Sequence, residues 1–171
     1  APVKIVALGD SATAGWLVAK TDAYPAELER KLRAKGLDVD VRNAGVSGDT
    51  SAGALKRLDL AVDPDTNIAL VEVGTNDLRL HVPAAKMRAN IAEIVRILQK
   101  RRILVMLIGL GSLDLADVAR EAKVPYAQFK LPPGKYRARD GAHFNAEGYR
   151  IVVARMLPQV ESLIAAVKPR R

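Results

Sequence analysis

The sequence contains no cysteine and only two histidines, His81 and His143. Without cysteine there can be no disulfide framework, no thiolate metal site and no cysteine nucleophile. Two histidines are too few for a histidine-rich metal cage. We therefore expect no metal and no other cofactor.

Aromatic residues and long apolar runs are also scarce. Aromatics make up 4% of the chain, which leaves little stacking surface for single-stranded nucleic acid. No apolar run reaches the roughly 18 residues that span a bilayer, so we expect no stable membrane insertion. The 171 residues, 49% of them hydrophobic, are enough for one domain, 1–171, with a core of its own.

Basic residues outnumber acidic ones, 27 to 19, for a net charge of +8. This excess keeps open a protein of another class, a non-enzymatic binder of nucleic acid or of an anionic envelope polymer. The sequence contains no helix-turn-helix, RNP aromatic pair or zinc finger. Solvent-facing helix residues such as Arg88, Arg96 and Lys100 explain the charge better, and we expect no nucleic-acid partner.

The chain begins at Ala1-Pro2-Val3 without an initiator methionine. A mature periplasmic or secreted protein would begin this way after loss of a signal peptide, and that is our expectation for its location. A trimmed sequence would begin in the same way, so a cytoplasmic location stays open. Homo-oligomerisation is equally open.

Short β-branched runs alternate with amphipathic helices along the whole chain. Strands are predicted at 3–8, 39–42, 68–73, 103–108 and 124–129, and helices at 24–35, 51–61, 83–101, 115–122 and 146–167, the last kinked or split at Pro158. This alternation predicts an α/β fold, a three-layer α/β/α sandwich around a five-stranded parallel sheet. Right-handed crossovers place the strand-to-helix loops at one edge, where ligands bind in such folds.

Polar, glycine-containing blocks occupy that edge. Ser11 directly follows the first strand, and Asp140 lies three residues before His143, close enough for a carboxylate to hold the imidazole. A serine hydroxyl becomes nucleophilic when such an imidazole takes its proton. Taken singly, Ser11 also fits a turn or N-cap serine, and the Asp140 block fits a surface turn before a helix. His81 has no such carboxylate and is interpreted as a surface or pocket-rim residue.

Two further blocks offer donors for a developing oxyanion, the backbone N–H of Gly48 and the side-chain amide of Asn76. Both residues also fit ordinary turns at strand exits. A phosphate-cradling loop is a third interpretation for the glycines near residue 48, but the spacing matches neither standard phosphate-binding pattern.

Gly9-Asp10-Ser11, Gly48, Gly74-Thr75-Asn76-Asp77 and Asp140-Gly141-Ala142-His143 together resemble the SGNH hydrolases, also called the GDSL esterase/lipase family. The resemblance covers the whole chain and is greatest to the small bacterial arylesterase and thioesterase I branch. It implies that Ser11 is the nucleophile, that His143 is the base and acid, and that Asp140 orients His143. It also implies an oxyanion hole formed by the Ser11 amide, Gly48 and Asn76.

The resemblance implies a serine esterase that hydrolyses small acyl esters, either aryl esters or thioesters, through an acyl-enzyme. A carbohydrate O-deacetylase with the same triad is the alternative. Residues beside the four blocks are expected to line the substrate pocket, namely Trp16, Leu78 and Leu110. Relatives usually carry Leu or Ile at position 12, so Ala12 predicts either a wider pocket or a neighbour that fills the space. Arg137 and Arg139 are either solvated charges or, if they face the pocket, receptors for an anionic substrate group.

Overall fold

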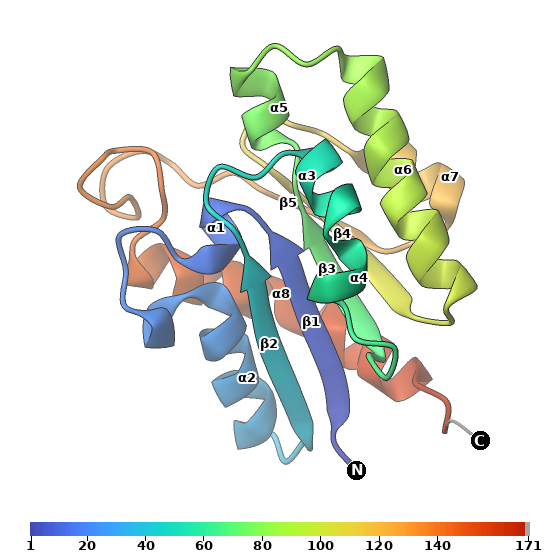
Figure 1. Cartoon of the computed structure of the whole chain (residues 1–171). Helices are drawn as coiled ribbons and strands as arrows, with labels where there is room; N and C mark the ends of the chain where they lie inside the picture. The colour runs from blue at the N-terminus through green and yellow to red at the C-terminus, as the bar shows by residue number, and fades with distance from the viewer. Residues whose placement is uncertain (170–171) are drawn as a thin grey trace.

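The structure, a computed structural model, describes residues 1–169 and contains one parallel sheet. Its strands lie in the order β2-β1-β3-β4-β5 (Figure 1). Their bounds are β1 Val3–Gly9, β2 Val39–Gly45, β3 Ile68–Glu72, β4 Leu104–Leu110 and β5 Tyr126–Phe129. This is the doubly wound order of flavodoxin-like folds, and the predicted five-stranded parallel sheet is confirmed.

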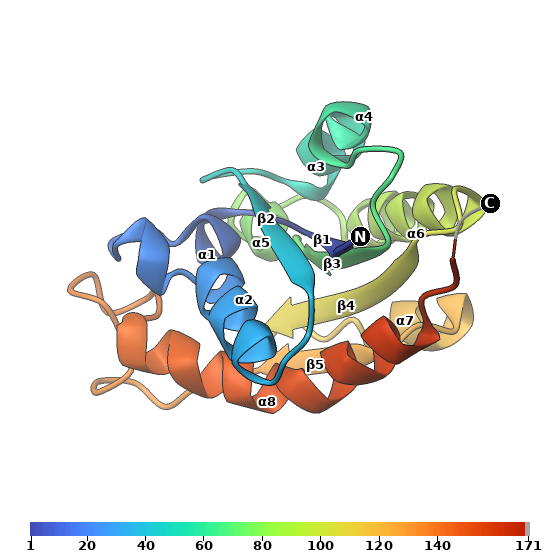
Figure 2. The same ribbon diagram turned by 90° about the horizontal axis from the view of Figure 1, so that it is seen from below.

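Helices cover both faces of the sheet (Figure 2). One face packs against α2 (Tyr24–Ala34) and α8 (Ala146–Ala166). The other packs against α3 (Ser51–Lys56), α4 (Leu58–Ala61), α6 (Ala84–Lys100) and α7 (Ala116–Ala122). The three-layer sandwich expected from the sequence is therefore confirmed.

The alternation of side chains along β1 explains how one strand serves two cores. Ile5 and Ala7 join the α2 and α8 core, whereas Val6 and Leu8 join the core beneath α6. Helix α6 presents one apolar stripe to the sheet, consisting of Met87, Ile91, Ile94, Val95 and Leu98, all buried. Burying each of these side chains contributes about 1.5–3 kcal/mol, so the helix is held mainly by this stripe.

Three local features differ from the sequence prediction. The polar blocks after β1 and β3 are short helices, α1 (Ser11–Ala14) and α5 (Thr75–Arg79), and a 3₁₀ turn follows at Lys20–Asp22. The helix predicted at 51–61 breaks at Arg57, which ends α3 and begins α4. Helix α8 is not split at Pro158, because buried Met156 and Val160 pack on either side and hold it against the sheet.

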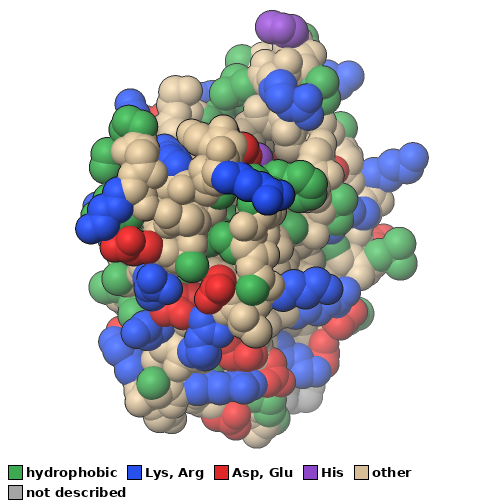
Figure 3. All heavy atoms as spheres, turned by 90° about the vertical axis from the view of Figure 1, so that its left-hand side faces the viewer, with side chains coloured by type: hydrophobic (Ala, Val, Ile, Leu, Met, Phe, Trp, Pro, Cys, Tyr) green, Lys and Arg blue, Asp and Glu red, His purple; other side chains and the backbone are tan. Residues whose placement is uncertain are grey.

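Much of the positive charge lies in surface ion pairs. On the face shown in Figure 3, basic and acidic side chains interleave rather than form one continuous basic patch. On α6, Arg88 contacts Asp117 and Arg96 contacts Glu93. Among residues 1–169, no helix is both long and apolar enough to cross a membrane.

Gly9 closes β1 at a crowded point of the carboxyl edge. A Cβ there would lie 2.1 Å from Thr13 Oγ1 and 2.7 Å from the carbonyl oxygen of Glu72. The carbonyl oxygen of Glu72 belongs to the backbone of β3 and cannot move aside easily. The turn before Ser11 can therefore approach β3 only because residue 9 is glycine.

We expect Gly9→Ala to lower the free energy of unfolding by about 1–3 kcal/mol or more, the range for overpacking a dense site. Urea unfolding measures this loss. Gly36→Ala is the control, because its Cβ would meet nothing within 4 Å and only its positive φ of 82° opposes the change. A Gly9→Ala variant as stable as wild type would show that the crowding at Gly9 is unimportant.

Candidate active site

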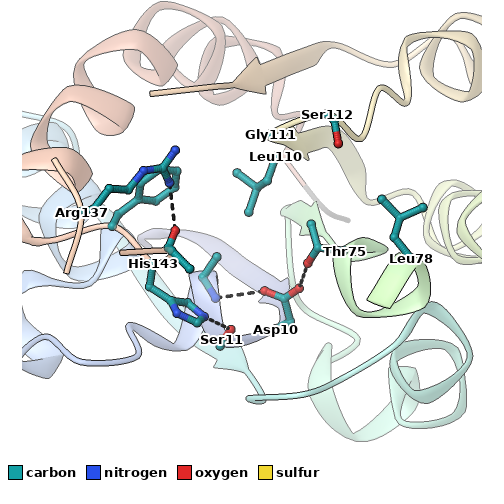
Figure 4. A pocket seen from close by; sticks show the side chains of 12 residues that line it. Asp10, Ser11, Thr75, Leu78, Leu110, Gly111, Ser112, Arg137 and His143 are labelled. Atoms are coloured by element: carbon teal, nitrogen blue, oxygen red, sulfur yellow. Dashed lines mark hydrogen bonds between the residues drawn. The ribbon is translucent and has the colours of Figure 1, made fainter. Parts of the chain in front are cut away.

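A pocket of about 340 Å³ opens at the carboxyl edge of the sheet (Figure 4). It collects residues from four separate parts of the chain: Asp10, Ser11, Ala12, Thr75, Leu78, Leu110, Gly111, Ser112, Arg137, Ala142, His143 and Phe144. Leu78 and Leu110 therefore lie where the sequence analysis expected them. The topology alone brings these segments together, because all follow strands or precede α8.

Two residues considered for the pocket lie elsewhere. Trp16 is outside the lining, with 49% of its surface exposed, because the chain reverses at Gly15 (φ +86°) and carries the ring outward. His81 is exposed and also lies outside the lining, in agreement with its interpretation as a surface residue.

Ser11 is the first residue of α1, and buried Asp10 caps that helix. Asp10 Oδ1 accepts a hydrogen bond from Ala12 N at 2.9 Å, and its Oδ2 accepts one from Thr75 Oγ1 at 2.7 Å. One carboxylate oxygen therefore caps α1, and the other ties the turn after β1 to the start of α5. The Ser11 amide is in the first turn, where no intrahelical acceptor is available.

Ser11, His143 and Asp140 form a continuous hydrogen-bonded chain. Ser11 Oγ lies 2.8 Å from His143 Nε2, and His143 Nδ1 lies 2.5 Å from Asp140 Oδ2. An ionised carboxylate can only accept, so Nδ1 carries the ring proton and Nε2 presents its lone pair to the Ser11 hydroxyl. The three residues predicted from the sequence are thus brought together in the arrangement that activates a serine.

The loop around Asp140 holds that carboxyl in its ionised form. Its Oδ1 accepts from the backbone N–H groups of Ala142 and His143, each at 3.0 Å. The His143 imidazole and then these two amides lower the pKa of Asp140 to about 2. Both this lowered pKa and the exposure of the side chain keep Asp140 charged at neutral pH.

The predicted oxyanion donors lie on segments that are fastened to the turn before Ser11. The carbonyl of Gly9 accepts from Val46 N at 2.9 Å and from Arg57 Nη2 at 3.1 Å, and Arg57 also contacts Asp49 at 2.7 Å. These bonds hold the loop that contains Gly48 beside α1. Gly48 itself is exposed, with φ +81°.

Asn76 Nδ2 donates to the carbonyl of Asp49 at 2.9 Å. An amide nitrogen has two hydrogens, so this bond fixes the direction in which the second one points. Neighbouring Asp77, which is buried, accepts from both Ser51 N (2.8 Å) and Ser51 Oγ (2.7 Å). Helix α5 is therefore locked to the segment that contains Gly48.

A buried acid, Glu72, lies beneath the pocket, and the sequence pattern did not indicate its role. Glu72, 2% exposed at the end of β3, accepts from Thr13 Oγ1 at 2.9 Å. Burial first, and then the charge of Asp10, raise the pKa of Glu72 well above its usual range. Glu72 therefore supports α1 through this hydrogen bond, and its burial favours the protonated form of the carboxyl. Its position in an apolar strand gave no indication of this contact, because Thr13 is distant in sequence.

The space left by Ala12 is filled mostly from α8. Tyr149 donates from its hydroxyl to the carbonyl of Ala12 at 2.6 Å and packs edge-on against Phe144. Between Ala12 and these rings remains a cavity of only about 10 Å³. Ala12 thus borders both the open pocket and this small cavity.

The serine, histidine and aspartate form one hydrogen-bonded chain at the carboxyl edge of the α/β sandwich. This arrangement is typical of serine hydrolases. The profile of the GDSL-like lipase/acylhydrolase family matches residues 7–151. The chain belongs to this family, which confirms the resemblance noted from the four sequence blocks.

Among curated proteins, the chain is similar to an arylesterase of Vibrio mimicus, with 32% identity over 56% of this chain and 48% of that protein. It is also similar to esterase TesA of Pseudomonas aeruginosa, with 31% identity over 62% of this chain and 53% of that protein. The chain thus spans about half the length of these relatives in the matched regions.

Two solved structures have a similar fold over nearly the whole of this chain. A crystal structure of TesA aligns with a TM-score of 0.83 at 23% identity, covering 94% of this chain and 99% of that one. AlinE4, described as an SGNH-hydrolase family esterase, aligns with a TM-score of 0.70 at 27% identity, covering 95% and 96%.

We expect Glu72→Gln to stabilise the protein relative to wild type increasingly as the pH rises above about 4.3, the ordinary glutamate pKa. A carboxyl whose pKa is raised by folding lowers stability once the unfolded chain can release its proton, and that loss continues up to the folded pKa. Glutamine remains neutral and keeps an acceptor for Thr13.

Melting temperatures measured across a pH series test this. Glu121→Gln, at an exposed site on α7, controls for removal of a carboxyl. If the difference between Glu72→Gln and wild type does not change with pH, Glu72 is not held neutral by the fold.

Proposed function

We propose that this protein is a serine esterase that hydrolyses esters with small acyl groups through a covalent acyl-enzyme. The observation that carries the proposal is the hydrogen-bonded chain from Ser11 through His143 to Asp140 at the mouth of the pocket. Membership of the GDSL-like lipase/acylhydrolase family supports it.

In the proposed first step, Ser11 Oγ attacks the ester carbonyl while His143 Nε2 takes the hydroxyl proton. Asp140 keeps the ring in the required tautomer and stabilises the imidazolium that forms. His143 then gives the proton to the leaving alcohol or thiol, and the acyl group remains on Ser11. In the second step His143 takes a proton from water as the water attacks the acyl carbonyl, and His143 then returns that proton to Ser11 Oγ as the acid leaves.

The negative oxygen of each tetrahedral intermediate is proposed to rest against the N–H groups of Ser11 and Gly48 and the side-chain amide of Asn76. Donors that are fixed in place before reaction stabilise this charge without having to reorganise. The bonds from Asn76 to Asp49 and from Val46 and Arg57 to Gly9 supply such fixation.

The pocket walls favour small acyl groups. Its apolar surface comes from Ala12, Leu78, Leu110 and Phe144, and Tyr149 with Phe144 fills the space below Ala12. We therefore propose short aryl esters as substrates, with thioesters as an alternative leaving-group class that uses the same residues.

We expect Ser11→Ala to reduce hydrolysis of p-nitrophenyl acetate and butyrate by about a thousandfold or more, because the acyl acceptor is lost. Ser112→Ala is the matched control, since Ser112 lines the same pocket on the side away from His143 (Figure 4). Circular dichroism checks that both variants fold.

The same assay with p-nitrophenyl laurate, a thioester and an acetylated saccharide defines the substrate class. Wild type should prefer acetate and butyrate to laurate. Wild-type turnover in Ser11→Ala would overturn the assignment of the nucleophile, and selective hydrolysis of the saccharide would point to a deacetylase.

We expect Asn76→Ala to lower kcat about a hundredfold, or ~3 kcal/mol, with little change in KM, because the lost donor acts on the intermediate. Asn67→Ala, at the opposite end of the sheet, is the control for loss of an asparagine side chain. Stopped-flow or steady-state assays separate kcat from KM. An unchanged kcat would remove Asn76 from the oxyanion hole.

A further inference from the structure

Arg137 contributes a guanidinium to the wall of the pocket, beside His143 (Figure 4). An arginine in such a place can serve in two ways. It can attract an anionic group of the substrate, or it can hold the wall itself in position. Its contacts distinguish the two.

The guanidinium of Arg137 is engaged from three sides. Its Nη1 donates to the carbonyl of Ala142 at 2.9 Å, and its Nη2 donates to the carbonyl of Leu131 at 2.7 Å. Its central carbon lies 5.1 Å from the centre of the Phe144 ring. Leu131 and Phe144 are buried in the core beneath α8, so Arg137 links this core to the loop that carries His143.

The Ala142–His143 peptide group is held at both of its ends. Arg137 binds its C=O, and Asp140 Oδ1 accepts from its N–H at 3.0 Å. Fixing this peptide plane restricts the backbone on one side of the His143 Cα and so helps to set the direction of its side chain. That direction decides whether Nε2 reaches Ser11 Oγ, which lies 2.8 Å away.

The surrounding segment is fixed mainly by isolated hydrogen bonds, among them those from Asn145 Nδ2 to the carbonyls of Lys135 and Arg137. Between β5 and α8 the chain forms no helix, and its backbone pairing is confined to the Arg137–Phe144 bridge and a few bonds such as Ala138 N to His143 O at 2.7 Å. Arg137, which bonds the carbonyls of both Leu131 and Ala142, therefore helps to fix the position of His143.

We propose that Arg137 is a positioning residue that holds the His143 imidazole in line with Ser11, rather than a receptor for anionic substrates. Two of its N–H groups are already committed to carbonyls, and the Phe144 ring lies against one of its faces. Lysine cannot replace it fully, because an ammonium on a flexible stem lacks the planar fork that reaches two carbonyls. This proposal rests on the proposed function in so far as the geometry it maintains is that of the base.

The first measurement does not need turnover. The protein has two histidines, so ¹⁵N-imidazole NMR gives two ring systems, and His81→Gln assigns the other to His143. In wild type we expect His143 as a single tautomer, protonated at Nδ1. In Arg137→Ala we expect its nitrogen shifts to move toward the average of the two tautomers.

The second measurement is kinetic. With p-nitrophenyl acetate, a neutral ester, Arg137→Ala should lose about tenfold to a hundredfold in kcat, the effect of a small misplacement, while KM stays within about twofold. Arg137→Lys should fall in between. Added guanidinium ion should restore part of the kcat of Arg137→Ala. Arg139→Ala, an exposed site on the same loop, removes the same charge and should show neither loss nor rescue.

Two results would overturn the proposal. One is an unchanged His143 spectrum and kcat in Arg137→Ala. The other is a KM increase confined to esters that carry a carboxylate or phosphate, which would make Arg137 an anion receptor. Should wild type hydrolyse none of the esters, the proposed function fails, and the His143 spectra still decide the positioning role.

Discussion

The active end of this molecule depends on close contact between the end of β1 and the carbonyl of Glu72 on β3, which requires glycine at position 9. With no Cβ in the way, Thr13 approaches β3 and donates to the Glu72 side chain. The Gly9 carbonyl then receives Val46 and Arg57 from the neighbouring loop. One missing side chain thus lets three segments meet around Ser11.

Buried acids secure this meeting point. A buried carboxyl destabilises a fold unless it is hydrogen-bonded or neutral. Asp10 is bonded through one oxygen to distant Thr75, Asp77 is bonded through both oxygens to Ser51, and Glu72, whose pKa is raised by burial, accepts from Thr13. These contacts fix α1 and α5 relative to each other, so the Ser11 side of the site is built on the sheet itself. The His143 side, by contrast, is a loop that depends on a small number of cross-links.

The sequence predicted the parts of this structure that depend on local pattern. Alternating apolar runs identified all five strands and the packing face of α6, and the spacing of Asp140 and His143 identified their contact. The contacts of Glu72 with Thr13 and of Arg137 with Leu131 and Ala142 could not be predicted, because each depends on how distant segments pack. The pocket position expected for Trp16 was wrong for a different reason. Trp16 is close to Ser11 in sequence, but the left-handed turn at Gly15 directs its ring to solvent.

The positions of the basic side chains show what several of the charges behind the net +8 contact. Arg33, Arg88 and Arg96 lie in surface ion pairs, which contribute little to stability. Arg57, which also pairs with Asp49, and Arg137 turn their guanidinium groups toward backbone carbonyls around the site. Arginine suits this task because its charge is permanent and its planar fork can satisfy two acceptors at once. Arg57 and Arg137 therefore hold backbone in place around the site, and Leu78, Leu110 and Phe144 supply the apolar part of the pocket wall.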